Sequence, residues 1–191
     1  EMLFQMQALM NIETFRGYEV KKILTCDPHA YNTFKNEYPD LGGHYEVIHH
    51  TQFLLEQIRS GRLQIPGGAL NGKTVTFHDP CYLGRANGEY DAPREVLKSI
   101  PGIELVEMER SRENSFCCGG GAGNFYTDFL HGGENSPSRI RVREAYGTGA
   151  GIMAVACPSC MTMLEDAVKT EGLEEKLAVK DIAEIVQEAL G

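Results

Sequence analysis

The sequence predicts an α/β fold made of βαβ units with parallel sheets. Short apolar runs, several of them rich in β-branched residues, alternate along the chain with segments whose apolar residues recur at helical spacing. Strands that alternate with helices are typical of parallel sheets covered by helices on their faces. At 191 residues, of which 42% are hydrophobic, the chain is also long enough to bury a core without disulfide bonds.

The first third of the chain is expected to hold two strands and three helices. Pro28 is expected to begin the second helix, because its fixed φ angle suits a first helical turn. The methionines of the first helix, Met2, Met6 and Met10, are expected to fill the core against the sheet. The expected elements are a helix over residues 2–15, a strand over 20–25, a helix over 28–38, a strand over 45–48 and a helix over 51–60.

A segment rich in glycine and proline, from Gly61 to Gly72, has little periodicity and is the expected boundary between two domains. Beyond it, the alternation of strands and helices resumes. Ser136-Pro137 is typical of a helix start, since serine caps a helix and proline fits its first turn. The expected strands cover residues 74–78, 103–108 and 152–156, and the expected helices cover 92–99, 136–145, 158–169 and 181–190.

The charge balance and the hydropathy exclude several classes of protein. Lys and Arg number 18 against 27 Asp and Glu, and the formal charge of −9 disfavours binding to phosphate backbones, so no nucleic acid partner is expected. No apolar run approaches the roughly 18 residues that a membrane span requires. We expect a reducing, cytoplasmic location. The chain begins at Glu1 rather than Met, so it is expected to be part of a longer polypeptide, and membrane association is expected only through upstream sequence or other subunits.

Five of the six cysteines lie in three loops that follow predicted strands, where α/β folds place their ligand sites. The three loops are expected to converge at one edge of a sheet. Five thiolates at one point would repel one another unless cations neutralised them, which indicates a metal ion or a metal cluster. The cysteines of this set are Cys81, Cys117, Cys118, Cys157 and Cys160.

The number and the surroundings of these cysteines favour an iron-sulfur cluster over zinc. Zinc commonly takes four ligands in a closed tetrahedron, whereas five thiols are available here. The backbone N–H groups of Gly119 and Gly120 can approach cluster sulfides closely, because glycine has no side chain. Pro158 is expected to begin a helix whose positive end faces the cluster. The sequence leaves zinc as the alternative metal.

His78 and Asp79 come just before Cys81 in the sequence. An imidazole at this place can donate a hydrogen bond to a cluster sulfur or deliver a proton to a reduced thiol, which makes His78 the candidate catalytic residue. Capping of the strand end explains these two residues equally well, and the sequence leaves both explanations open. Cys26 is expected to be a buried thiol at a strand end rather than a ligand.

The remaining histidines and a set of arginines receive structural explanations. His29, His49 and His50 are expected at a helix start or at the surface, rather than in a metal site with Asp27. Three arginines of the helix over residues 136–145 are expected to form a solvated face, with contact to an acidic partner as the other option. They are Arg139, Arg141 and Arg143.

The cysteine pattern and the residues around it resemble the cysteine-rich CCG domain of heterodisulfide reductase catalytic subunits. Between Cys81 and Cys117 lie 35 residues, and between Cys118 and Cys157 lie 38. The segments His78-Asp79-Pro80-Cys81-Tyr82-Leu83-Gly84-Arg85 and Met161-Thr162-Met163-Leu164-Glu165-Asp166 also fit this family. The resemblance implies a noncubane 4Fe-4S cluster held by all five thiolates, with electron transfer or disulfide reduction as the chemistry.

The resemblance extends to the first half of the chain, because such proteins carry two CCG domains in tandem. Residues 32–39 are similar to the helix that follows a first cysteine knuckle, and His49-His50 fit as well. At the knuckle itself, Asp27-Pro28-His29-Ala30 replaces the Cys-Pro-His-Cys of the family. The resemblance therefore implies a first, incomplete domain over residues 1–65 and a second domain with the iron-sulfur site over residues 66–191.

This resemblance also implies a function. The expected protein is an iron-sulfur oxidoreductase subunit that carries electrons between a flavoprotein or redox complex and a quinone or another acceptor. Its expected partners are other redox subunits, among them an electron-transfer flavoprotein. One alternative is reduction of a disulfide or thiol at the cluster, and a second is a structural zinc domain without redox activity.

Overall fold

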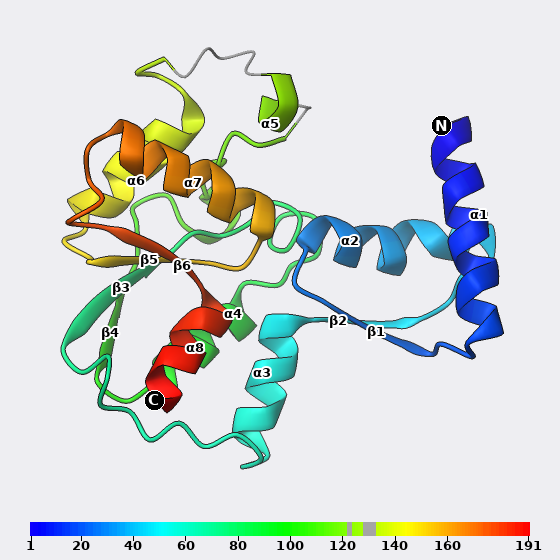
Figure 1. The fold of residues 1–191 in the computed structure, drawn as a ribbon, viewed down its shortest axis with the longest axis horizontal. Helices are drawn as coiled ribbons and strands as arrows, with labels where there is room; N and C mark the ends of the chain where they lie inside the picture. Colours follow the sequence, from blue (N-terminus) through cyan, green and yellow to red (C-terminus); the bar gives the residue numbers. More distant parts are fainter. Residues whose placement is uncertain (122–123, 128–132) are drawn as a thin grey trace.

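The computed structural model describes residues 1–121, 124–127 and 133–191 of the chain. In this part of the chain the strands form two sheets, in which all neighbouring strands run parallel (Figure 1). The smaller sheet pairs β1 (Lys22–Thr25) with β2 (Glu46–His49). The larger sheet contains β3 (Lys73–Phe77), β4 (Ile103–Val106), β5 (Ile152–Val155) and β6 (Ala178–Asp181), in the order β4-β3-β5-β6. The predicted α/β class is confirmed.

Four of the described helices cover the two faces of the larger sheet: α4 (Asp91–Lys98), α6 (Pro137–Gly147), α7 (Pro158–Thr170) and α8 (Ile182–Leu190) (Figure 1). Successive residues of β5 point to opposite faces. Ile152 and Ala154 join the core formed with α4 and α8, whereas Met153 and Val155 join the core formed with α6 and α7. Because both faces are covered, β5 is apolar and buried along its whole length.

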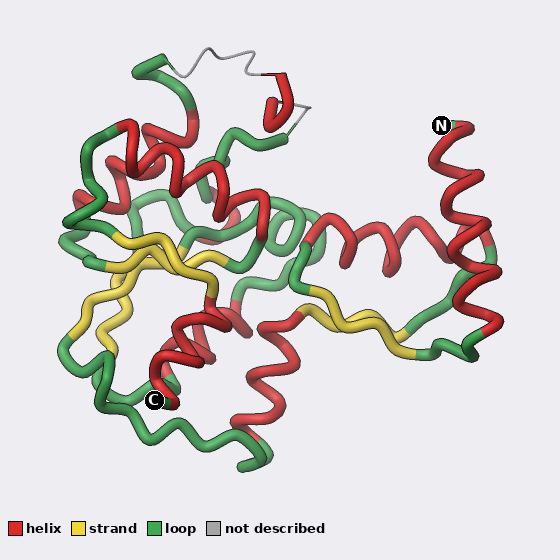
Figure 2. Tube along the Cα trace, in the orientation of Figure 1, coloured by secondary structure: helices red, strands yellow, loops and turns green. Residues whose placement is uncertain are grey.

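The N-terminal part of the chain extends away from the larger sheet, with β1 and β2 beside α2 and with α1 at the far end (Figures 1 and 2). It contains α1 (Met2–Gly17), α2 (Pro28–Asn32) and α3 (His50–Arg59). Helix α3 turns back and packs against α4 and α8, so that Leu54 and Ile58 contact the core below the larger sheet. No helix among the described residues is both long and apolar enough to cross a bilayer.

The helical segment after Pro28 changes type along its length. Helix α2 continues as a π turn over Thr33–Glu37 and a 3-10 turn over Tyr38–Leu41, and Gly42 ends the segment with a φ of +85°. The sequence predicts one regular helix over residues 28–38. The observed helix is irregular where Pro39 follows, because proline has no N–H to donate to the preceding turn.

Two other predictions differ from the structure. The prediction that Met2, Met6 and Met10 fill the core is wrong, because all three are exposed. Strand β6 is not predicted, because its sequence ends in two charged residues and carries little apolar signal. Among its described residues, the connection between β4 and α6 holds two short helices, η3 (Arg112–Asn114) and α5 (Asn124–Thr127).

The chain repeats one structural unit. The first repeat, β1-α2-β2-α3, and the second repeat, β5-α7-β6-α8, each contain two parallel strands joined through a helix and followed by another helix. In both repeats the first helix has a cap residue and then proline, Asp27-Pro28 and Cys157-Pro158. In both, the third residue of the last helix accepts a hydrogen bond from the backbone N–H just before that helix. Gln52 accepts it from His49 at 3.1 Å, and Glu184 accepts it from Asp181 at 2.8 Å.

Candidate metal centre

The five cysteines that the sequence groups together line one pocket at the carboxyl ends of β3 and β5. One cysteine follows β3, a pair lies in the long connection after β4, and two lie at the start of α7 directly after β5. Because parallel strands end at the same edge of a sheet, loops distant in sequence meet there. The pocket cysteines are Cys81, Cys117, Cys118, Cys157 and Cys160.

The thiols in the pocket are close enough to share protons. The Sγ atom of Cys160 lies 3.4 Å from the Sγ atom of Cys118 and donates a hydrogen bond to it. Hydrogen bonds from the Cys117 and Cys160 thiols lower the pKa of Cys118 well below its ordinary value, although burial opposes the shift. The same contacts raise the pKa of Cys117 and of Cys160, and burial raises the pKa of Cys81. The pocket therefore concentrates negative charge at Cys118, next to thiol protons that a bound metal would displace.

Cys157 is a second position of negative charge. A hydrogen bond from Cys160 lowers the pKa of Cys157 to about 5 against the effect of burial, and His29 adds a further hydrogen bond. Cys157 is also the cap residue of α7, where the helix dipole stabilises a thiolate. The hydrogen bond to Cys157, opposed by partial burial and aided by Asp27, raises the pKa of His29 to about 9. His29 is therefore a cation between two acidic groups, with its Nδ1 atom 3.0 Å from Asp27 Oδ1.

His29 belongs to the first repeat, yet it lines the pocket beside Tyr82. The ring centroids of these two residues lie 4.5 Å apart. His29 does lie at the start of a helix, as predicted, but its contact with Cys157 is not indicated by the sequence. The contact depends on how the two repeats pack. The one available signal is the place of His29 in Asp27-Pro28-His29-Ala30, the counterpart of the cysteine knuckle.

His78 is outside the described residues that line the pocket and lies in a buried network behind Cys118. Its backbone N–H donates to the Ala154 carbonyl at 2.9 Å, which ties the end of β3 to β5. Its ring lies within 4.8 Å of the sulfur atoms of Cys118 and Cys160, and its hydrogen bond to Cys118 contributes to the low pKa of that thiol. Behind the ring, Arg141 Nε donates to His78 Nδ1 at 3.1 Å.

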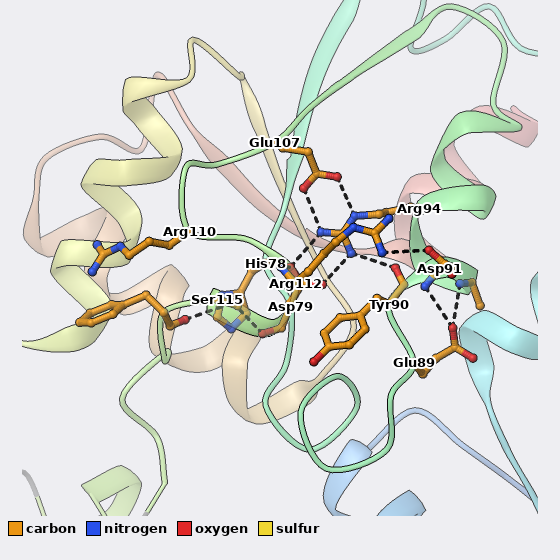
Figure 3. A network of polar contacts seen from close by, with 12 residues as sticks. His78, Asp79, Glu89, Tyr90, Asp91, Arg94, Glu107, Arg110, Arg112 and Ser115 are labelled. Atoms are coloured by element: carbon orange, nitrogen blue, oxygen red, sulfur yellow. Dashed lines mark hydrogen bonds and ion pairs between the residues drawn. The ribbon is translucent and has the colours of Figure 1, made fainter.

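Asp79 anchors the loop that carries Cys81. The Nη1 and Nη2 atoms of Arg94 donate to its two carboxylate oxygens at 2.6 and 2.9 Å, and the backbone N–H of Arg112 donates to the same carboxylate at 2.8 Å. Arg94 also donates to Glu107, so its guanidinium lies between two carboxylates (Figure 3). Burial acts to lower the pKa of Arg94, but these hydrogen bonds outweigh burial and raise it. The loop after β3 is therefore held firmly against α4 and the segment after β4.

Two glycines follow the cysteine pair, and one of them, Gly120, lines the pocket. The backbone N–H of Gly119 donates to Cys117 Sγ at 3.2 Å, and the φ of Gly119 is +86°, in the region that favours glycine. Gly120 lines the pocket, and a Cβ atom there would lie 3.1 Å from Met163 Cγ and 3.7 Å from Cys118 Sγ. Five thiols and a backbone N–H that donates to sulfur form a donor set that fits an iron-sulfur cluster.

Three predictions about burial are wrong. Cys26 is exposed rather than buried, and it lies outside the described residues that line the pocket. His49 and His50 do lie at a helix start, as predicted, since His49 is the cap residue of α3 and His50 its first residue, but both are buried rather than at the surface. His50 Nε2 lies 3.1 Å from Asp181 Oδ1. Arg141 is buried rather than part of a solvated face. Local spacing is a poor guide to the burial of His50 and Arg141, because segments distant in the sequence pack against them.

The fold and the site define a class of protein, an α/β protein with a cysteine-rich site at the edge of a parallel sheet. Residues 75–165 match the model of the cysteine-rich domain family, CCG. The match runs from β3 into α7 and includes all five pocket cysteines. The resemblance stated from the sequence is confirmed.

Three curated relatives align with almost the whole chain. The "Probable iron-sulfur-binding oxidoreductase FadF" of Bacillus subtilis (strain 168) is 46% identical over 193 residues, which cover 100% of this chain and 26% of the relative. The "EtfAB:quinone oxidoreductase" of Syntrophomonas wolfei subsp. wolfei is 39% identical over 195 residues, which cover 100% and 27%. A dihydromethanophenazine:CoB--CoM heterodisulfide reductase subunit of Methanosarcina barkeri is 38% identical over 184 residues, which cover 95% and 44%. The chain spans less than half the length of these relatives.

Proposed function

We propose that this chain is the cluster-binding part of an iron-sulfur oxidoreductase subunit, and that its pocket holds a noncubane 4Fe-4S cluster. The observation that carries the proposal is the presence of five thiols from three separate loops around one pocket. Such a cluster, when bound, accepts and releases single electrons. Similarity to a protein named an EtfAB:quinone oxidoreductase supports a path from an electron-transfer flavoprotein, through other redox subunits, to a quinone.

The residues of the pocket have distinct roles in this proposal. Cys118 and Cys157 are the ligands most readily available as thiolates, because their pKa values are lowered. Gly119 and Gly120 let the backbone approach the sulfur atoms, and His78 donates a hydrogen bond to a ligand sulfur. The proposed ligands are Cys81, Cys117, Cys118, Cys157 and Cys160.

We infer also that residues 1–65 are the remainder of a first, degenerate CCG-type domain and that residues 66–191 are the second domain. The order of elements in the two repeats supports this division. Aligned on their proline residues, Asp27 and Ala30 take the places of Cys157 and Cys160. The first repeat therefore lacks the thiols that a knuckle needs to hold a metal.

A second candidate function is reduction of a disulfide or thiol at the same site. His29 and Tyr82 support it, because both line the pocket and both are partly exposed, so a substrate can reach them from solvent. The cationic His29 would stabilise a thiolate formed next to Cys157. Similarity to the heterodisulfide reductase protein of Methanosarcina barkeri supports this candidate.

Metal analysis of the full chain, purified anaerobically, tests the proposal. We expect about four iron and four sulfide per chain, visible absorption bands and an electron paramagnetic resonance signal that changes on reduction. One zinc per chain, without colour, would overturn both candidate functions and leave a structural zinc domain. Reduction by a flavoprotein, compared with turnover of a disulfide substrate, then distinguishes the first candidate from the second.

A further inference from the structure

His78 and Arg141 form a buried pair behind Cys118, and Arg141 is outside the set of proposed ligands. The exposed fractions of the two residues are 1% and 0%. His78 follows β3 and Arg141 lies in α6, so segments 63 residues apart meet at this point. A buried guanidinium is costly unless its donors find partners.

Arg141 has such partners on each side of its guanidinium. Its Nη1 atom donates to the Arg110 carbonyl at 2.8 Å and to Glu144 Oε2 at 3.0 Å, and its Nη2 atom donates to the Ser115 hydroxyl at 3.4 Å. These contacts set the plane of the guanidinium. The remaining donor, Nε, then points at His78 Nδ1 over 3.1 Å.

The contact with Arg141 determines which nitrogen of His78 carries hydrogen. A guanidinium only donates hydrogen bonds, so His78 Nδ1 accepts. In a neutral imidazole the hydrogen is then on Nε2. A nitrogen of the His78 ring lies within 4.8 Å of the sulfur atoms of Cys118 and Cys160. Because Nδ1 already accepts from Arg141, Nε2–H is the group left to face the Cys118 sulfur.

We infer that Arg141 is a positioning residue that holds His78 in the tautomer whose Nε2–H donates to the Cys118 sulfur. The inference rests on the proposed function, since its consequence is measured on the bound cluster. A hydrogen bond to a ligand sulfur stabilises the reduced and more negative state, and thereby raises the reduction potential. Arg141 acts on the potential through His78 without touching a ligand.

A pair of substitutions at His78 tests the direction of the hydrogen bond. The longer side chain in His78→Gln places an N–H near the position of Nε2, whereas the shorter one in His78→Asn reaches only the position of Nδ1. In a redox titration of the full chain, followed by electron paramagnetic resonance, we expect the potential of His78→Gln to stay near that of the wild type. We expect the potential of His78→Asn to be lower. Any other order overturns the inference.

A second pair tests the role of Arg141. Arg143 lies on the same helix, is exposed and bonds to Glu171 and to the Glu134 carbonyl, so Arg143→Met removes a charge without touching His78. We expect Arg141→Met to lower the potential more than Arg143→Met, and to change the resonance line shape where Arg143→Met does not. In a His78→Ala background the two arginine substitutions should have equal effects. An Arg141→Met shift of the same size in both backgrounds overturns the inference.

Iron content distinguishes failure of the proposed function from failure of the inference. If the wild-type chain binds no cluster, the proposed function and the inference both fail; if it binds a cluster whose potential ignores these substitutions, only the inference fails. Circular dichroism and thermal unfolding establish that each variant is folded. If Arg141→Met does not fold, Arg141→Lys takes its place in the same comparison, because lysine keeps the charge but lacks the Nε–H that donates to His78.

Discussion

The two repeats share a backbone arrangement but not a chemistry. In the first repeat the Tyr31 N–H donates to the Asp27 carbonyl at 2.9 Å, and in the second the Met161 N–H donates to the Cys157 carbonyl at the same distance. Each knuckle is built from a strand, a cap residue and a proline that begins the helix. The backbone of a knuckle therefore does not depend on cysteine, and the ligands can be replaced while the local structure remains.

The repeats also differ in burial. All four residues of β5 are buried, because it lies between strands of the larger sheet with helices on both faces. Strand β1 alternates between exposed and partly buried residues, because its sheet has two strands. The first repeat nevertheless contributes to the pocket of the second, through the contact of His29 with Cys157. The first repeat therefore contributes to the site although it has Asp27 and Ala30, and no cysteine, at the positions of Cys157 and Cys160.

The largest expected effect comes from giving the second knuckle the sequence of the first. The double substitution Cys157→Asp and Cys160→Ala should abolish binding of the proposed cluster, because two of five thiols are lost from the pocket. Iron analysis and the visible spectrum measure this effect. Cys26→Ser is the matched control, since Cys26 is exposed and should be replaceable with full retention of iron. Full iron in the double variant would show that the knuckle supplies no ligands.

The last helix of the first repeat is capped by His49, and that of the second repeat by Asp181. The histidine predicts a pH dependence of stability that is specific to the first repeat. Burial, reinforced by the neighbouring His50, lowers the pKa of His49 to about 3, whereas an unfolded histidine titrates near about 6.5. At pH values between these two pKa values, the unfolded chain binds more protons than the folded chain. The stability that this group contributes is therefore complete above about pH 6.5 and falls by up to about 1.4 kcal/mol per pH unit as the pH falls toward 3.

His49→Asn should flatten this pH dependence, because asparagine does not titrate and is itself a favoured cap residue. Urea unfolding at several pH values between about 4.5 and 7 measures the slope. His44→Asn is the control, since His44 is exposed and its replacement should leave the slope unchanged. If the slope of the His49 variant equals that of the wild type, His49 does not stay neutral in the folded protein.

Asp181 occupies the corresponding cap position in the second repeat. Its carboxylate accepts from the Ala183 N–H at 2.8 Å and lies 3.1 Å from His50 Nε2. Asp181→Ala should lower the free energy of unfolding by about 1 kcal/mol, and Asp181→Asn should lower it less, because asparagine still caps the helix. Urea unfolding of both variants at neutral pH checks the order. Equal losses would mean that the contact with His50, rather than the cap, carries the effect.

The smallest effect is expected at Asp27, the first-repeat counterpart of Cys157. Its carboxylate accepts from the His29 N–H at 3.0 Å, but it caps a short helix and is partly exposed. Asp27→Ala should lower the free energy of unfolding by about 0.5 kcal/mol, at the low end for a lost cap, and should leave iron content unchanged. Loss of iron would show that the first knuckle still supplies a ligand.

The order of most elements and the grouping of the five cysteines could be predicted from local signals. Apolar runs mark β3 and β5, and Ser136-Pro137 marks the start of α6. Strand β6 could not be predicted from local signals, because two of its four residues are charged. It forms through its pairing with β5, which the local sequence does not show. The burial of Arg141 also could not be predicted from local signals, because His78, Arg110 and Ser115, which accept hydrogen bonds from it, lie far from α6 in the sequence.

The sequence by itself determined which groups are available: five thiols at loop positions, glycines beside the cysteine pair, and a cap residue with proline at each knuckle. These follow from preferences that act over a few residues. Only the tertiary structure decided that His29 contacts Cys157 and that Arg141 orients His78. Both contacts join segments that meet only when helices and repeats pack, and that packing depends on burial summed over the whole chain rather than on local spacing.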